Sequence, residues 1–374
     1  MSDDIKKGLM GVTVDETAIS KVMPEINSLT YRGYAAQDLC AKCKFEEVAY
    51  LILNGELPNK KQLKDFEKQE SKERKLSKTL IEAIKKNPKK NHPKEVAKNS
   101  EKKNGLEDKE TRSNSPKANM RKIMRIFSKT PVALAAFYRS RKGKKIIPPK
   151  KKLSFSENFF HMCFGKVPNK DIVKAFDVSL ILYAEHSFNV STFTARTITS
   201  SLSDIHGAIT GAISSLKGPL HGGANEEVMH MMNKIKKPEN ALKWINNALD
   251  NKDVVMGFGH RVYKSGDSRV PTMREYFGKV AKIKKDKKFE KIYDIVEKVM
   301  IERKDIHPNV DYPTGPTYHL MGFDTDFFTP IFVISRITGW SAHIMEQYAA
   351  NKLIRPLASY NGSQHRKVVQ LNQR

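Results

Sequence analysis

The sequence predicts an all-α protein, and three observations support this prediction. Apolar residues recur at the 3.6-residue helical period over most of the chain from residue 158 onward. Glycine and proline interrupt these segments at helix-length intervals. The two-residue alternation of a strand is confined to short runs such as 367–371. No segment repeats at a fixed period, so we expect one helical fold without internal repeats.

The first 150 residues are irregularly interrupted. The expected segments are an extended or turning arm over 1–30, a turn over 30–34, a helical pattern over 39–52 that ends at Gly55, one long polar helix over 60–86, a loop with weak helical content over 87–116, a helix over 118–138 and a linker at 148–149.

The remainder of the chain shows stronger periodicity. Helices are expected over 158–163, 171–184, 189–201, 204–216, 226–235, 240–249, 272–282, 288–301, 317–321 and 329–351.

Composition limits the class of protein. With 374 residues, 39% hydrophobic and 29% charged, the chain can bury a sizeable core and is expected to form two domains. Its apolar runs are shorter than the roughly 18 residues of a membrane span. The N-terminus lacks the basic and apolar regions of a signal peptide. We therefore expect a cytoplasmic protein without membrane contact.

The three cysteines predict no disulfide framework. Cys40 and Cys43 form a C-x-x-C pair, but no second pair and no histidine at zinc-ligand spacing accompanies them. We expect them to be packing residues.

Positive charge is concentrated in one segment. The formal net charge is +26, and residues 60–152 hold 31 lysine and arginine residues against 10 acidic ones. Such a segment attracts polyanions by releasing counterions. It has no recognised nucleic-acid motif and few interleaved aromatic residues. A solvated lysine-rich face is therefore favoured over nucleic-acid binding.

The strongest candidate site is a histidine corner. His221 lies in residues 218–225 (GPLHGGAN), where a Gly-Pro pair is expected to end the helix over 204–216. Asn225 is expected to cap the next helix, which has acidic residues in its first turn. A corner of this kind can present an imidazole and free backbone N–H groups to a ligand.

Three further polar clusters stand out. They are residues 185–189 (EHSFN), residues 254–269 around His260, and residues 307–313 around Asp311. Taken singly, each has an ordinary structural interpretation, because a histidine at a helix end is usually a capping or core residue. An aspartate after Pro-Asn-Val is more often a turn residue than a base.

Three common site types are disfavoured. Residues 257–259 (GFG) lack the third glycine and the preceding strand of a dinucleotide-binding loop. The spacing of His221, His260 and Asp311 is not that of metal ligands, so no metal is expected. No G-x-S-x-G elbow of a serine hydrolase is present.

Seven motifs occur in one order over essentially the whole chain. They are GLMGVTVDETAISKV and NSLTYRGY near the N-terminus, AEHSFNVSTFTAR (184–196), KGPLHGGANE (217–226), VMGFGHRVYKSGDSR (255–269), PNVDYPTGPTYHLMGFDTDFFTPIFVISRITGWSAHIMEQ (308–347) and IRPLASYNG (354–362). In this combination the chain resembles the citrate synthase family, and most closely its 2-methylcitrate synthase branch.

The resemblance implies a Claisen-type condensation of propionyl-CoA with oxaloacetate, and hydrolysis to 2-methylcitrate and CoA, with acetyl-CoA also accepted. Asp311 matches the family's base, which removes an α-proton of the thioester. His221 matches the donor to the enolate oxygen. His260 matches the group that polarises the keto carbonyl.

The resemblance also implies the groups that bind the substrates. Arg269, Arg336 and Arg355 match guanidinium clamps for the two carboxylates of oxaloacetate, and Arg355 is expected to act across the interface of a homodimer. His186 matches a further oxaloacetate contact, and Arg74 a substrate-side contact. Coenzyme A is the cosubstrate, expected to bind Val254, Val255, Met256, Gly257, Phe258 and, through a phosphate, Lys304.

The family fold implies a large helical domain over 1–221 and 326–374 and a smaller domain over 222–325. Gly222 and Gly223 are expected to act as the hinge of a cleft that closes on oxaloacetate and excludes water. One departure is the lysine-rich segment 94–117, where the family has an apolar helix. That helix is expected to be shortened or loosely packed.

Two alternatives remain open at this point. The first is an ordinary citrate synthase that uses acetyl-CoA, because an apolar pocket discriminates one methylene by only about 1–3 kcal/mol. The second belongs to a different class, a catalytically weak scaffold whose basic segment 60–152 binds a polyanion. That scaffold would bind nucleic acid tightly, with a steep dependence on salt.

Overall fold

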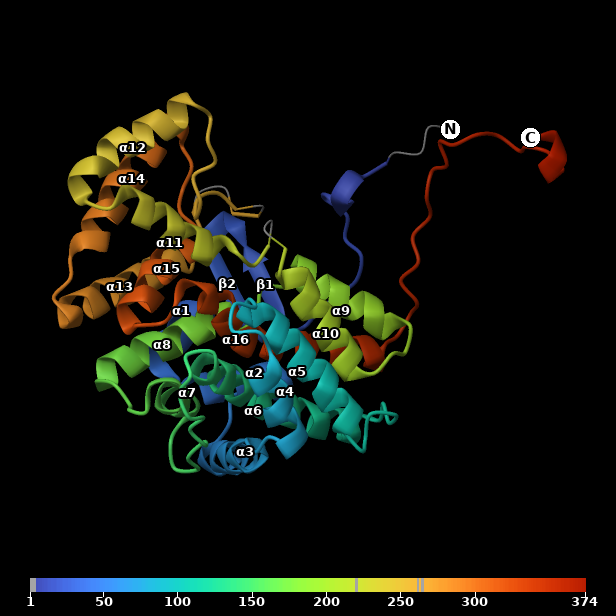
Figure 1. Cartoon of the computed structure of the whole chain (residues 1–374), viewed down its shortest axis with the longest axis horizontal. Coiled ribbons are helices and arrows are strands. Elements are labelled where there is room, and N and C mark those ends of the chain that lie inside the picture. The colour runs from blue at the N-terminus through green and yellow to red at the C-terminus, as the bar shows by residue number, and fades with distance from the viewer. Residues whose placement is uncertain (1–4, 219–220, 261, 264–265) are drawn as a thin grey trace.

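The architecture is predominantly helical, as the periodicity predicts. The computed structural model describes residues 5–218, 221–260, 262–263 and 266–374, which form sixteen α-helices and one small sheet (Figure 1). In order, the helices are α1 Ala36–Lys42, α2 Phe45–Asn54, α3 Lys60–Glu73, α4 Lys78–Lys86, α5 Pro93–Glu107, α6 Pro116–Ser140, α7 Phe155–Phe164, α8 Lys170–Tyr183, α9 Val190–Ser200, α10 Ile205–Leu216, α11 Ala224–Ile235, α12 Pro238–Asp250, α13 Val270–Lys284, α14 Lys288–Lys304, α15 Asp311–Met321 and α16 Phe328–Ala349.

A three-stranded antiparallel sheet near the N-terminus was not expected from the sequence. Strands β1 Ser20–Met23 and β2 Ser28–Tyr31 pair with Ser20 opposite Tyr31, and β2 pairs with β3 Tyr34–Ala35. The last third of the extended or turning arm that was expected over 1–30 therefore belongs to a sheet. Three of the four β2 residues are buried, so β2 lacks the alternation that reveals a half-exposed strand.

Helix boundaries depart from the sequence prediction in two places. The pattern over 60–86 forms two helices, because Ser77 begins α4 by accepting a hydrogen bond from the Leu80 backbone N–H at 3.0 Å. The pattern over 39–52 is likewise divided between α1 and α2. Propensity and periodicity continue through both breaks, so only the capping contacts reveal them.

Helix α5 corrects the expectation of a loop or a loosely packed helix at 87–117. It is a helix of fifteen residues, and four of its eight buried residues are polar. Gly105 makes this packing possible, since a Cβ there would lie 2.7 Å from the Cβ of His206 on α10. The prediction failed because a helix held by buried polar contacts shows no apolar stripe.

An ion cluster joins α5, α6 and α10. The imidazole of His206 lies between Glu101, with Nδ1 to Oε1 at 2.7 Å, and Asp108, with Nε2 to Oδ2 at 3.2 Å. Arg125 on α6 pairs with the same Asp108 at 2.7 Å. Burial alone would lower the pKa of His206, but these carboxylates together raise it to about 9.

The His206 cluster makes stability depend on alkaline pH. Because the pKa is raised from 6.5 to about 9 in the folded state, the stabilisation is fully present below pH 6.5 and is lost as the pH rises through 9. We expect the melting temperature of the wild type to fall over this range more steeply than that of His206→Gln. Thermal unfolding of both proteins from pH 6 to pH 10 checks this, and parallel curves would contradict it.

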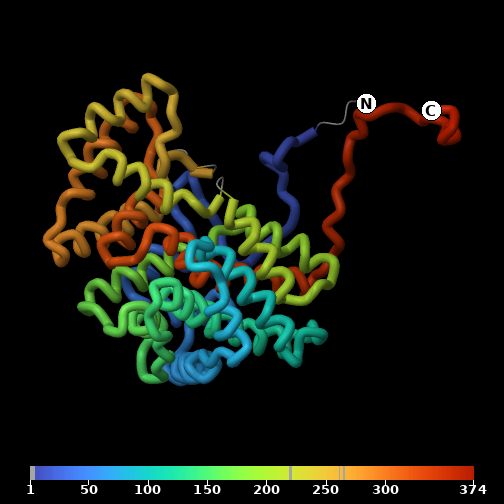
Figure 2. The backbone as a smooth tube through the Cα atoms, in the orientation of Figure 1, coloured from blue at the N-terminus to red at the C-terminus, as the bar shows by residue number. Residues whose placement is uncertain are grey.

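Helix α16 lies at the centre of the molecule, and 18 of its 22 residues are buried. Helices α11 to α14 form a group on one side of it, drawn in yellow and orange in Figure 1. The backbone trace in Figure 2 shows the C-terminal residues leaving the body as an extended tail. None of the helices in the described residues is both long and apolar enough to span a membrane.

Candidate active site

The C-terminal end of α8 anchors the site. The last carbonyls of a helix have no partner within it, and here other elements supply the donors. The contacts are Ser335 Oγ to the Leu180 oxygen, Tyr31 Oη to the Ile181 oxygen at 2.9 Å, Arg336 Nε to the Tyr183 oxygen at 2.5 Å and the Gly339 N–H to the Ala184 oxygen at 3.1 Å. The loop that follows α8 therefore starts from a fixed position.

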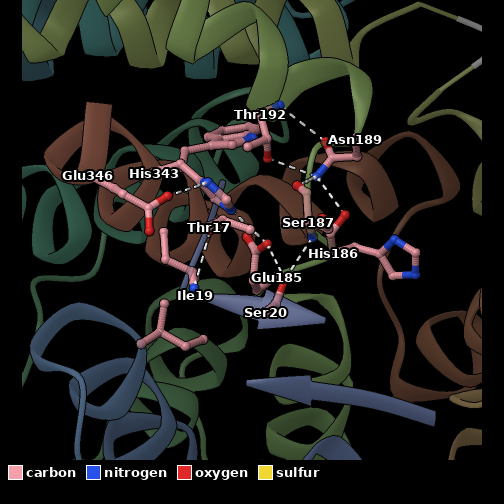
Figure 3. Close-up of polar contacts among 12 residues, drawn as sticks. Thr17, Ile19, Ser20, Glu185, His186, Ser187, Asn189, Thr192, His343 and Glu346 are labelled. Atoms are coloured by element: carbon pink, nitrogen blue, oxygen red, sulfur yellow. Dashed lines mark hydrogen bonds and ion pairs between the residues drawn. The ribbon is translucent and has the colours of Figure 1, made fainter. Parts of the chain in front are cut away.

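His186 is held from both sides by one hydroxyl (Figure 3). Ser20 Oγ on β1 donates to Glu185 Oε1 at 2.8 Å and accepts the Ser187 backbone N–H at 2.9 Å. His343 on α16 contacts the same Glu185 oxygen at 2.9 Å. The His186 side chain points away from this network, and its buried Nε2 has no hydrogen-bond partner among the described residues.

Two imidazoles face each other beside Tyr263. The ring centroids of His186 and His260 are 5.1 Å apart. His260 Nδ1 accepts the backbone N–H groups of Val262 at 3.0 Å and Tyr263 at 3.2 Å, so in the neutral ring the proton lies on Nε2. Burial and then the charge of Arg269 lower the pKa of His260 to about 4. Burial also lowers the pKa of His186, well below its usual value. Both rings are therefore uncharged near neutral pH.

Arg269 is fixed by an aspartate that the sequence did not single out. Asp267 pairs with it through two contacts, Nε to Oδ1 at 2.9 Å and Nη2 to Oδ2 at 2.7 Å. Asp267 Oδ2 also accepts the Val310 backbone N–H at 3.0 Å, one residue before Asp311. One carboxylate thus positions a cationic clamp and the start of α15 together.

Asp311 is the first residue of α15 and contacts Tyr183. The Tyr183 hydroxyl donates to Asp311 Oδ1 at 2.5 Å. Burial raises the pKa of Asp311 above its usual value, while the hydrogen bond from Tyr183 opposes that rise. A raised pKa makes a carboxylate a stronger proton acceptor, and the hydroxyl fixes the direction in which it points.

Loss of the Tyr183 hydroxyl should shift the pH dependence of turnover. In Tyr183→Phe the pKa of Asp311 rises further because the opposing hydrogen bond is gone, so a base at this position is ionised only at higher pH. We expect the acid limb of the kcat profile to move to higher pH. Tyr293→Phe, which removes the hydroxyl that contacts Glu297, serves as the control, and an unmoved limb in Tyr183→Phe would contradict the argument.

His221 lies between α10 and α11 and contacts Ser191. Its Nε2 is 2.8 Å from Ser191 Oγ and 3.2 Å from the Ser191 backbone nitrogen. A backbone N–H can only donate, so neutral His221 carries its proton on Nδ1. Burial and then the charge of Arg336 lower its pKa to about 4. His221 is therefore a neutral hydrogen-bond donor through Nδ1.

Arg336 links these groups electrostatically. Its positive charge acts on His221, His186 and Asp311, lowering the pKa of each. Burial lowers its own pKa to about 10, which leaves it charged at neutral pH. The carboxylate of Asp311 and the imidazoles of His221 and His186 thus lie within the electrostatic range of one guanidinium.

The corner of α10 and α11 differs in one detail from the prediction. Helix α11 begins at Ala224 with Gly223 in the capping position, so Asn225 is inside the helix and does not cap it. Asn225 is fully buried there against α15, where a Cβ on Gly315 would lie 2.7 Å from its carbonyl oxygen. Pro219 and Leu220 lie outside the described residues.

The segment expected to bind coenzyme A pairs with the chain before α15. The Gly257 oxygen accepts the Asn309 N–H at 2.8 Å, and the Gly259 N–H donates to the His307 oxygen at 2.8 Å. Gly257 has φ +85°, and a Cβ there would lie 2.6 Å from Val228, so no other residue fits. Val254 is 82% exposed and Val255 is buried. A cavity of about 260 Å³ opens beside His260, against Gly259 and His307.

Three of the expected site residues lie apart. Arg74 is buried at the end of α3, where it pairs with Glu70 and donates to the carbonyl oxygens of Lys150 at 2.7 Å and Leu153 at 3.0 Å. The expected substrate-side contact of Arg74 stays a prediction. Arg355 is exposed on the C-terminal tail, and Lys304 is exposed at the end of α14.

Sequence reasoning missed Tyr183, Ser191 and Asp267. Each of them contacts a candidate residue. Spacing in the sequence could not reveal the contacts of Tyr183 and Ser191, whereas Asp267 is only two positions before Arg269. An acid at that spacing was a usable signal. No group of three or more metal-ligating side chains occurs among the residues that the structure describes.

Comparison with known proteins gives the family. The model described as "Citrate synthase, C-terminal domain" matches residues 8–357. A curated relative, 2-methylcitrate synthase 2 of Corynebacterium glutamicum, is 52% identical over 99% of this chain and 98% of its own. This chain belongs to the citrate synthase family. A second relative, the citrate synthase of Mycolicibacterium smegmatis, is 51% identical over 98% of this chain and 97% of its own.

Solved structures of citrate synthases share the whole fold. The Thermoplasma acidophilum citrate synthase, in a ternary complex with carboxymethyl coenzyme A and oxaloacetate, matches with TM-score 0.93 at 31% identity over 99% of this chain and 100% of its own. The Thermotoga maritima enzyme matches with TM-score 0.89 at 34% identity over 99% of both chains. As a member of the citrate synthase family, the chain is an acyltransferase that condenses an acyl-CoA with oxaloacetate.

Proposed function

We propose that this citrate synthase family enzyme condenses propionyl-CoA with oxaloacetate and releases 2-methylcitrate and CoA. The observation that carries the proposal is the grouping of Asp311, neutral His221 and Arg336 described above. A base with a raised pKa and a neutral donor within range of one guanidinium suit the removal of a weakly acidic proton.

The proposed chemistry assigns one role to each group. Asp311 removes an α-proton of the thioester, and His221 Nδ1–H donates a hydrogen bond to the enolate oxygen that forms. The enolate carbon then attacks the keto carbon of oxaloacetate, while His260 Nε2–H donates a hydrogen bond to the keto oxygen. The alkoxide that results takes up one proton, equivalent to the proton that Asp311 removed, and becomes the hydroxyl. Water finally cleaves the thioester, which yields the tricarboxylic acid and free CoA.

Oxaloacetate would be held by Arg269, Arg336 and His186. Both arginines are buried, with 5% and 2% of their surface exposed, so a charge-assisted hydrogen bond to a carboxylate would be strong there. We propose that coenzyme A follows residues 254–258, with Lys304 at a phosphate. The small domain over 222–325 would close on the large one and exclude water.

We propose a homodimer in which Arg355 acts across the interface. The tail that carries it exposes large apolar side chains, with Leu357 88% and Tyr360 77% exposed, which favours a partner surface in solution. Size-exclusion chromatography with light scattering of the full chain tests the dimer. Mixing Arg355→Ala with a variant inactive at Asp311 tests the cross-subunit role, because activity would recover only if each subunit supplies the residue that the other lacks.

Two observations support the preference for propionyl-CoA. Relatives such as the Corynebacterium protein are 2-methylcitrate synthases, and the sequences of residues 184–188 and 311–328 resemble that branch of the family. The second candidate, citrate synthase proper, is favoured by the Mycolicibacterium relative, which is almost equally similar. Steady-state turnover of oxaloacetate with propionyl-CoA and with acetyl-CoA, followed by release of free thiol, separates them. We expect the higher kcat/KM with propionyl-CoA. A higher value with acetyl-CoA would make the enzyme a citrate synthase, and no turnover by folded protein would refute the condensation.

A further inference from the structure

One face of α16 carries the groups that hold the site. Arg336, Gly339 and His343 contact the residues at the end of α8, as described above. Trp340 lies on the same face, one helical turn after Arg336, and is fully buried. Its Nε1 is 3.1 Å from Ser191 Oγ, which is the oxygen that contacts His221.

The donor and acceptor roles in this chain of contacts follow from the chemistry of the indole. An indole N–H can only donate, so Ser191 Oγ accepts from Trp340. The hydroxyl proton of Ser191 then points either to His221 Nε2 at 2.8 Å or to Asn189 Oδ1 at 2.8 Å. Asn189 Oδ1 already accepts the Thr192 backbone N–H at 3.2 Å as the cap of α9.

We propose that Trp340 is a positioning residue that orients the Ser191 hydroxyl toward His221 Nε2. The indole N–H engages one of the two lone pairs of Ser191 Oγ and holds the hydroxyl in the orientation that directs its proton to Nε2, while the imidazole proton stays on Nδ1. Hydrogen bonds that run in one direction polarise one another, so the Nδ1–H becomes a better donor. The inference rests on the proposed role of His221 as donor to the enolate oxygen.

The variant Trp340→Phe tests this role because it keeps an aromatic ring in the buried slot and removes the N–H together with part of the indole; the double-mutant cycle below separates the two losses. We expect kcat to fall by roughly three- to tenfold, the usual range for one lost hydrogen bond, with KM for oxaloacetate unchanged. The same loss is expected in a partial reaction, the exchange of the α-protons of propionyl-CoA with heavy water. That exchange is followed with a 2-hydroxy dicarboxylate in place of oxaloacetate, so that no carbon–carbon bond forms.

A double-mutant cycle separates positioning from packing. If Trp340 acts through the Ser191 hydroxyl, then Trp340→Phe adds no further loss in the background of Ser191→Ala. Losses that multiply in the double variant would show that Trp340 only packs, and would overturn the proposal. Unchanged exchange and unchanged kcat in Trp340→Phe would overturn it as well.

The chain offers a matched control in its other tryptophan. Trp244 on α12 is partly buried against the core, and Trp244→Phe should leave kcat and exchange at wild-type values. Wild-type turnover is measured in the same experiment. If the wild type fails to turn over substrate, the proposed function is wrong; if it is active and Trp340→Phe matches it, only the role of Trp340 is wrong.

Discussion

Asp311→Asn should reduce kcat by roughly 10³-fold, within the usual range for loss of a general base. Asparagine keeps the shape of the side chain, and its oxygen can still accept the hydrogen bond from Tyr183 that Asp311 accepts at 2.5 Å. The amide cannot take up the α-proton of the thioester. The loss should therefore appear in kcat and in proton exchange, while the fold and the binding of oxaloacetate remain.

The measurement is steady-state thiol release with propionyl-CoA, together with the melting temperature of the variant. Asp294→Asn is the control, because Asp294 on α14 is an exposed partner of Arg274 on α13. This substitution removes a carboxylate that does not contact the candidate site. Retention of more than a tenth of wild-type kcat in Asp311→Asn would remove Asp311 from the role of base.

Gly339→Ala should have the largest effect on stability and should also reduce activity. A Cβ at position 339 would lie 2.5 Å from the Ala184 backbone oxygen and 2.2 Å from Glu185 Oε2. The backbone oxygen cannot turn away, so α16 and the loop after α8 must separate, at a cost of about 1–3 kcal/mol. Because that loop carries His186, kcat/KM for oxaloacetate should fall together with the melting temperature.

Gly278→Ala is the matched control for this substitution. Gly278 is also inside a helix, but its added Cβ would meet only the ends of flexible side chains, Glu290 at 3.2 Å and Arg274 at 3.4 Å. Alanine is a better helix former than glycine by about 1 kcal/mol, so this variant should be as stable as the wild type or more so. Equal effects of the two substitutions would contradict the close approach at Gly339.

The helices could be predicted from the sequence wherever an apolar stripe faces the core, as in α10 and α16. The prediction failed where burial does not follow that pattern. Helix α5 buries Glu101 against His206 on α10, and such a pair reads as two surface residues in the sequence. Strand β2 is buried on both faces and is only four residues long.

The candidate site could be predicted as a set of residues but not as a geometry. Family motifs contain Asp311, His221 and His260, yet the groups that hold them come from distant segments. Tyr183 precedes Asp311 by 128 residues, and Ser191 precedes His221 by 30. Matching the position of Arg74 likewise could not reveal that Glu70 engages its guanidinium.

The end of α8 has a consequence for how the chain folds during synthesis. The Leu180 oxygen accepts a hydrogen bond from Ser335, 155 residues later in the chain, and the Tyr183 oxygen accepts one from Arg336, 153 residues later. Contacts so distant in sequence form late, and a ribosome delivers the N-terminal part first. The nascent chain therefore carries an incomplete α8 end until α16 has emerged. The loop that carries His186 becomes ordered only when translation is nearly finished.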